Sequence, residues 1–206
     1  IGMFQFYRGE DSMALHTLSE ARAIAPASTV ILNNRAKVLT GMGRVDDALK
    51  DYDKVVELDS VNFPAHFNRA YLRFQTGDSV GASSDLAILE KIAPDDPNTL
   101  LLLAVANSNR GYYTEAVSYY NRLIEKEKKA EYYTGRAMAR LAKGDLAEAS
   151  DDIGRGLELD PHDGELYFCR AYLHLLQYDE ESARADAKLA ASYGVDPARI
   201  KELFSK

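Results

Sequence analysis

Four arginines in the chain are each followed, sixteen residues later, by an aspartate. The pairs are Arg35 with Asp51, Arg69 with Asp85, Arg136 with Asp152, and Arg170 with Asp186. A guanidinium group matches the geometry of a carboxylate and can donate two parallel hydrogen bonds to it. Each pair is therefore suited to a bidentate ion pair, while the four arginines alone could instead form a row of groups that bind an anionic ligand.

The spacing indicates where these residues lie in the fold. The midpoints of the pairs are possible turn positions, namely Gly43, Gly77, Gly144 and Tyr178. If a helix precedes and follows each turn, both partners lie about 12 Å from it at ~1.5 Å per residue, so they meet across a helical hairpin. One further repeat carries Leu103 and Tyr119 in these places, so both charges are absent together. An unpaired buried charge is costly, and we interpret the pairs as structural ion pairs within hairpins.

A period of about 34 residues runs through the chain. Six alanines follow one another at spacings of 34, 34, 34, 33 and 34 residues: Ala14, Ala48, Ala82, Ala116, Ala149 and Ala183. A turn position precedes each alanine by five residues, and a small residue precedes each turn by seven. Glycine adopts the left-handed backbone that ends a helix, and small residues let helices pack closely. Each repeat is therefore predicted to be a helical hairpin.

Two local details lead to further expectations about the hairpins. Tyr178 replaces the turn glycine of the other repeats, so we expect the last turn to have a different backbone geometry. Asp145 and Glu148, three residues apart after Gly144, predict a capping box at the start of a helix.

These markers resemble those of the tetratricopeptide repeat family. The clearest matches are NRAKVLTGMGRVDDALKDYDKVVELDS (34–60) and TGRAMARLAKGDLAEASDDIGRGLELDP (134–161), and the resemblance covers residues 1 to about 195. Departures are the lack of tryptophan and the segment EKEKKA (125–130), which replaces a proline region. The resemblance implies an all-α fold, a right-handed α-solenoid of about six helix-turn-helix repeats with a C-terminal capping helix.

We expect a single solenoid domain over residues 1–206. Its units would span about 1–28 (truncated), 29–62, 63–96, 97–129, 130–163 and 164–195. Ile1 falls in the middle of a first helix, which fits either a trimmed or disordered start or a slice of a longer array. A capping helix is predicted over 197–204, because Asp196 is a good N-cap, Pro197 suits the first helical position, and apolar residues follow on one face.

The composition narrows the functional classes. The chain has 32 acidic and 25 basic residues, a formal net charge of −7, which argues against a nucleic-acid partner. No apolar run approaches the ~20 residues of a membrane span. The only cysteine, Cys169, cannot form an internal disulfide, so it does not indicate a redox compartment. We expect a soluble protein, cytoplasmic or, if an upstream signal peptide was removed, periplasmic or secreted.

Catalytic and metal-binding patterns are weak in this sequence. The histidines, His16, His66, His162 and His174, do not have metal-ligand spacing. Cys169 and His174 would lie about 140° apart around one helix, so they do not form a nucleophile pair. We expect a partly buried thiol and a surface imidazole. No phosphate-binding glycine loop is present, and we predict a non-enzymatic protein with no metal and no cofactor.

The family resemblance also implies a binding face, lined by the first helix of each unit. The implied peptide-binding residues are Asn33, Lys37, Phe67, Asn68, Tyr71, Phe74, Leu101, Val105, Met138, Phe168 and Tyr172. This set is apolar and aromatic in the middle and polar at its N-terminal end. We therefore expect a protein or peptide partner with apolar anchors, bound in a concave groove.

One ligand known for the family, the acidic tail of heat-shock chaperones, is disfavoured. It would need two basic residues on a third helix, where this chain has Asn98 and Leu102. The alternative to peptide binding is a structural spacer or self-association element of a longer repeat protein.

Overall fold

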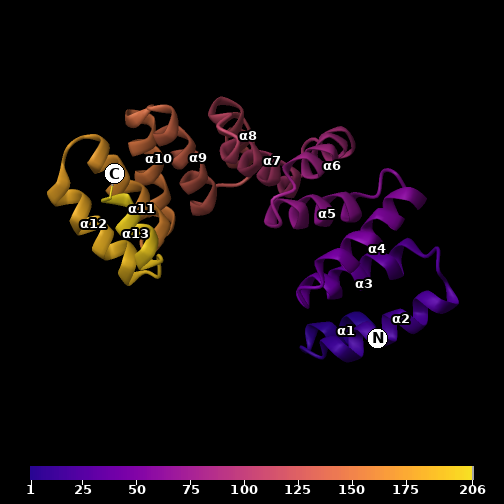
Figure 1. Ribbon diagram of the computed structural model, residues 1–206. Helices are drawn as coiled ribbons and strands as arrows, with labels where there is room; N and C mark the ends of the chain where they lie inside the picture. The colour runs from indigo at the N-terminus through magenta and orange to yellow at the C-terminus, as the bar shows by residue number, and fades with distance from the viewer. Residues whose placement is uncertain (206) are drawn as a thin grey trace. The chain divides into compact units, whose positions relative to one another are not determined.

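The computed structural model describes residues 1–205. This part of the chain forms thirteen helices joined by short connections, with no strand (Figure 1). The first six helices are α1 Gly2–Tyr7, α2 Asp11–Ile24, α3 Thr29–Gly41, α4 Val45–Leu58, α5 Phe63–Gln75 and α6 Ser79–Ile92. The others are α7 Pro97–Asn109, α8 Tyr113–Lys126, α9 Ala130–Lys143, α10 Leu146–Leu159, α11 Gly164–Leu176, α12 Glu180–Ser192 and α13 Pro197–Leu203.

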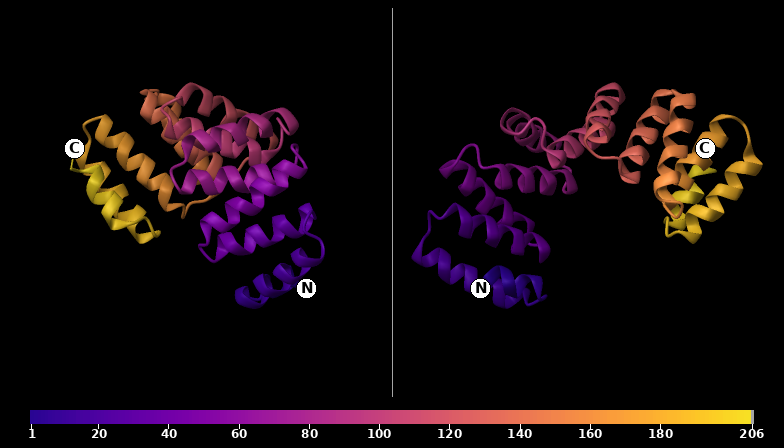
Figure 2. Two further views of the ribbon diagram at one scale, coloured as in Figure 1. Left: turned by 45° about the vertical axis from the view of Figure 1, so that its right-hand side comes forward. Right: turned by 180° about the vertical axis from the view of Figure 1, so that it is seen from behind.

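The helices belong to two compact units, and each is described by itself. The first unit comprises residues 1–99 and the second begins at Leu100, within α7. In the first unit, α1 with α2, α3 with α4, and α5 with α6 pack as successive hairpins (Figure 2). In the second unit, α9 with α10 and α11 with α12 form hairpins, α8 packs against α9, and α13 packs against α12.

The turns within the hairpins share one backbone conformation. Gly9, Gly43, Gly77, Gly111 and Gly144 have φ values between 72° and 92°. Tyr178 has a φ of 62°, in the same left-handed region, so the expectation of a different geometry at the last turn is wrong. A side chain with a Cβ adopts this region at a cost of roughly 1–2 kcal/mol. The closing of the hairpin therefore determines the turn conformation even without glycine.

Side-chain caps begin several helices. Oxygen atoms of Ser28, Asn62, Asp163 and Asp196 accept hydrogen bonds from backbone N–H groups in the first turns of α3, α5, α11 and α13. The predicted capping box at α10 is wrong. Asp145 is the N-cap residue, but its carboxylate receives a hydrogen bond from Lys143 Nζ at 2.6 Å and none from the helix.

Small residues form the contacts between helices. The alanines of the 34-residue period are fully buried in the second helices: Ala14, Ala48, Ala82, Ala116, Ala149 and Ala183. Gly135 in α9 shows how close this packing is, since a Cβ there would lie 2.3 Å from Cζ of Tyr120. The protein thus has an all-α helical-repeat fold that ends in the capping helix α13. Among the described residues, no helix has the length and apolar character needed to cross a bilayer.

Candidate functional site

The structure brings each arginine together with the aspartate sixteen residues later. Arg35 donates to Asp51 from Nε at 2.7 Å and from Nη2 at 2.6 Å, and Arg170 donates twice to Asp186 at 2.7 Å. Arg136 bonds to Asp152 at 2.9 and 2.5 Å, and Arg69 bonds to Asp85 at distances down to 2.5 Å. All four carboxylates are buried. These arginines therefore neutralise charges inside the hairpins.

A second basic side chain, an arginine or a histidine, lies beside each buried carboxylate, and the sequence analysis did not predict it. The contacts are Arg73 with Asp85 at 2.8 Å, Arg140 with Asp152 at 2.6 Å, His174 with Asp186 at 3.4 Å, and Arg22 with Asp51 at 3.8 Å. In the first three, the second group follows the paired arginine by four residues, one helical turn along the same face. The expectation of a surface imidazole at His174 is corrected, because its ring lies partly buried beside Asp186.

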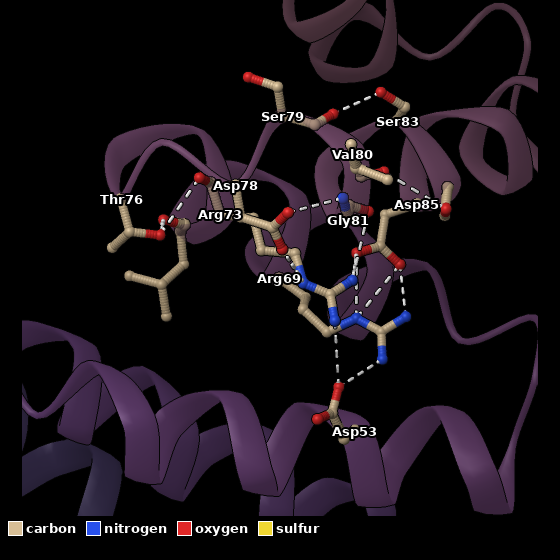
Figure 3. Close-up of polar contacts among 12 residues, drawn as sticks. Asp53, Arg69, Arg73, Thr76, Asp78, Ser79, Val80, Gly81, Ser83 and Asp85 are labelled. Atoms are coloured by element: carbon tan, nitrogen blue, oxygen red, sulfur yellow. Dashed lines mark hydrogen bonds and ion pairs between the residues drawn. The ribbon is translucent and has the colours of Figure 1, made fainter.

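The hairpin of α5 and α6 holds the most extensive polar cluster. Both guanidinium groups, of Arg69 and Arg73, lie between Asp85 and Asp53 (Figure 3). His66 is also buried there, with Nδ1 2.8 Å from Asp85 Oδ1 and Nε2 3.0 Å from the carbonyl oxygen of Ser60. Asp85 therefore has three side-chain partners, all from α5.

Two of the paired arginines also connect neighbouring hairpins. Nη1 of Arg69 donates to Oδ1 of Asp53 on α4 at 2.7 Å. Nη1 of Arg136 donates to Oδ1 of Asn121 on α8 at 2.6 Å. The guanidinium groups thus use two nitrogens within their own hairpin and a third to reach the second helix of the preceding one.

The first helices of unit one carry the polar end of the predicted binding face. Asn33 on α3 donates to Oδ1 of Asn62 at 3.0 Å, across to the start of α5. Lys37 is exposed, with Nζ 3.3 Å from the hydroxyl of Tyr7 and 5.4 Å from the centre of its ring. This end of the face therefore has one ammonium group supported by an aromatic ring.

An aromatic patch follows on α5. Phe67 stacks on Phe63 with ring centres 6.0 Å apart. Asn68 and Phe74 are half-buried, and Tyr71 is 49% exposed. Tyr71 is thus the large side chain on α5 that is most open to a partner.

In the second unit, the predicted binding residues lie in different environments. Val105 is exposed and Leu101 packs beside Leu100 and Ala104. Met138 and Tyr172 are half-buried against the core between α9, α10 and α11.

Phe168 is buried beneath the C-terminal helix instead of facing solvent. Only 8% of Phe168 is exposed, and Ile200 and Leu203 of α13 pack in its cluster. The Arg199 guanidinium lies 4.8 Å from the centre of the Phe168 ring and is paired with Glu165 at 2.5 and 2.9 Å. Phe168 is therefore mostly covered by α13, and the part that remains accessible lines the pocket beside it.

A pocket of about 900 Å³ lies beside this contact. Met138 and Tyr172 line it together with Leu175 and, on the α13 side, Leu203 and Phe204. The turn residue Tyr178, which is 96% exposed, also lines it. The apolar face of the second unit is thus partly covered by α13 and partly open.

Cys169 on α11 is fully buried in the core cluster against which Met138 and Tyr172 pack, more than the partial burial that we expected. Burial raises the pKa of its thiol, and the nearby carboxylates of Glu165 and Asp163 raise it further. Such a thiol stays protonated and unreactive at neutral pH.

Helical hairpins in series, joined by left-handed turns and packed through small residues, define a helical-repeat protein. Residues 33–97 and residues 130–163 both match sequence models described as tetratricopeptide repeat. The chain is a tetratricopeptide repeat protein, and the fold is one that serves as a scaffold for protein–protein interaction.

Solved structures agree with this assignment of the fold. A tetratricopeptide repeat protein from Parabacteroides merdae is 29% identical, with a TM-score of 0.72 over 98% of this chain and 79% of that chain. PilF of Pseudomonas aeruginosa is 15% identical, with a TM-score of 0.79 over 98% of this chain and 92% of that chain. YrrB, described as a tetratricopeptide repeat protein with an unusual peptide-binding site, is 18% identical. Its TM-score is 0.72 over 90% of this chain and 96% of that chain.

Proposed function

We propose that the chain binds a segment of a partner protein on the faces of its first helices, through apolar and aromatic anchors. The observation that carries the proposal is the open aromatic patch on α5, where Tyr71 is 49% exposed beside half-buried Phe67 and Phe74. Aromatic side chains dominate binding hot spots, because they bury a large area at a small cost in side-chain entropy. An open cluster of this kind favours a peptide with its own apolar side chains.

The pocket beside Tyr172 supports a second anchoring point in the other unit. Its volume of about 900 Å³ is that of a ligand-sized site, and its walls are mainly apolar. A peptide side chain could enter beside Tyr172 and Leu175 without displacing α13. We propose no catalytic role for either face, since the supporting ionic groups are used in structural pairs.

Peptides selected from a phage-displayed library against residues 1–206 would test the proposal. Their affinities would be measured by fluorescence anisotropy for the wild type, Tyr71→Ala and Tyr172→Ala, with Tyr112→Ala as a matched control. Tyr112 is 56% exposed and precedes α8, outside the predicted face. We expect Tyr71→Ala or Tyr172→Ala to weaken binding at least about tenfold, the scale of a hot-spot residue, while the control keeps its affinity.

Unchanged affinity in both variants would contradict the proposal. A lower affinity accompanied by a large fall in melting temperature would also contradict it, because the variant would then have lost its fold and not a binding contact. The alternative, a self-association element, predicts that the exposed aromatic patch is covered by another copy. Sedimentation velocity over a range of concentrations distinguishes the two, because Tyr71→Ala would then abolish a concentration-dependent increase in mass.

A further inference from the structure

A small polar pocket is lined by residues of α2 and α3 and of the start of α4. Its volume is about 250 Å³. The charged side chains that line it are Arg22, Arg35, Arg44, Lys50, Asp47 and Asp51. Four cations and two carboxylates give the pocket a net charge of +2, although the whole chain carries −7. Such a local excess of positive charge inside a concavity favours an anion.

Arg35 has an unused donor at this pocket. Its Nε and Nη2 donate to Asp51, and among the described residues its Nη1 makes no hydrogen bond. The corresponding nitrogens of Arg69 and Arg136 donate to Asp53 and Asn121 on the preceding second helix. In this hairpin a polar donor thus lacks the acceptor that two other hairpins supply.

The missing acceptor corresponds to Ser19. Ser19 lies sixteen residues before Arg35, as Asp53 lies sixteen before Arg69, and it lines the pocket. Its side chain is shorter than that of aspartate and forms no hydrogen bond with Arg35. The pocket therefore occupies the place where a carboxylate or amide oxygen lies in the other repeats.

Two further cations at the pocket are loosely held. Arg22 is 3.8 Å from Asp51 with 43% of its side chain exposed, and Lys50 is 3.4 Å from Asp47 with 74% exposed. Both can turn towards an added anion, since Arg35 still pairs with the buried Asp51 and Arg44 still pairs with the partly exposed Asp47.

We propose that this pocket binds a phosphate group, either the free anion or one carried on the side chain of a partner. A phosphate dianion matches the net charge of +2, whereas a carboxylate would leave one positive charge uncompensated. Its oxygens can accept from Nη1 of Arg35 and from the Ser19 hydroxyl, and Arg22 and Lys50 can close over it. None of these residues belongs to the proposed peptide-binding faces, so the site is independent of that function.

The test is a titration of the ¹⁵N-labelled chain with inorganic phosphate at constant ionic strength, followed by NMR. The Nε–H resonance of Arg35 and the amide of Ser19 are expected to shift with a saturable dependence. Acetate, titrated in parallel, is expected to bind at least tenfold more weakly. A phosphoserine amide as a third probe identifies the source: tighter binding than inorganic phosphate indicates a phosphorylated side chain, and weaker or equal binding indicates the free anion.

Ser19→Asp should supply the missing oxygen from the protein itself and weaken phosphate binding at least tenfold. Ser12→Asp is the matched control, because it adds the same charge to α2 about 10 Å closer to the N-terminus of the helix. That distance exceeds the ~8 Å screening length at physiological salt. The control should change the affinity less than twofold.

Shifts that do not saturate would overturn the proposal. Equal binding of acetate and phosphate, or equal phosphate affinity of Ser19→Asp and the wild type, would also overturn it. If Ser19→Asp does not fold, Arg22→Ala decides the question: a loss of at least threefold supports the site, and an unchanged affinity refutes it.

Discussion

Leucine in place of Arg35 is expected to destabilise the protein more than leucine in place of Arg69, although both arginines pair with a buried aspartate. Asp51 is 1% exposed and receives its hydrogen bonds from Arg35, with Arg22 at 3.8 Å as the remaining cation. Asp85 would keep Arg73 and His66, both at 2.8 Å. The loss of stability should therefore be larger for Arg35→Leu, because Asp51 keeps only one distant partner whereas Asp85 keeps two close ones.

The magnitudes follow from these contacts. Arg35→Leu leaves a buried carboxylate without a close partner, which costs about 3–5 kcal/mol. Arg69→Leu removes hydrogen bonds to a charged group that stays paired, at a cost of about 1.5–3 kcal/mol. Adding Asp51→Tyr to Arg35→Leu reproduces the combination of Leu103 and Tyr119 in α7 and α8 and should recover more than half of the loss.

The assay is urea denaturation followed by circular dichroism at 222 nm. Native-state hydrogen exchange would show whether the loss is located in α3 and α4 or in α5 and α6, because unfolding of a repeat protein need not be two-state. Equal costs for the two single variants would refute the reasoning about remaining partners. A double variant as unstable as Arg35→Leu would refute the view that a stranded charge causes the loss.

Three other expectations concern the second unit. Tyr178→Gly should raise the free energy of unfolding by about 1 kcal/mol, because it relieves a left-handed tyrosine; a decrease measured by urea denaturation would contradict this. Cys169, whose thiol pKa is raised by burial, should react with iodoacetamide at pH 8 at least a hundredfold more slowly in the native protein than in urea, and equal rates would show that it is accessible. Deleting residues 197–206 should expose Phe168, lower the melting temperature and increase association measured by light scattering, whereas an unchanged monomer would show that α13 is not a cap.

Local features account for the parts of the fold that could be predicted from sequence. A turn between antiparallel helices brings residues at equal distances from it to the same height, so Arg136 and Asp152 could be paired from their numbers alone. The second arginine, Arg140, lies four residues after Arg136, so its position beside Asp152 was also predictable from the helical spacing. The turn at Tyr178 was predicted wrongly because residue preference was given more weight than the geometry that closes the hairpin.

The candidate site was harder to predict because it depends on contacts between elements. Phe168 has the sequence position of an exposed face residue, and its burial results from the way α13 folds back over it. Nothing local to Phe168 encodes that contact. The pocket at Ser19 likewise becomes visible only when the partners of Arg35 and Arg69 are compared in the structure.

We expect the third guanidinium nitrogen of each paired arginine to influence which hairpins unfold together. In the first unit, Arg69 links the hairpin of α5 and α6 to α4, whereas Arg35 makes no corresponding bond to α2. In the second unit, Arg136 links α9 to α8, whereas the residue sixteen positions before Arg170 is Gly154, which has no side chain to accept a hydrogen bond. In a linear array with coupling between neighbours, unequal links divide the array into blocks of different cooperativity. We therefore expect α1 with α2, and α11 with α12, to open as separate outer hairpins at a lower free energy than the linked hairpins beside them.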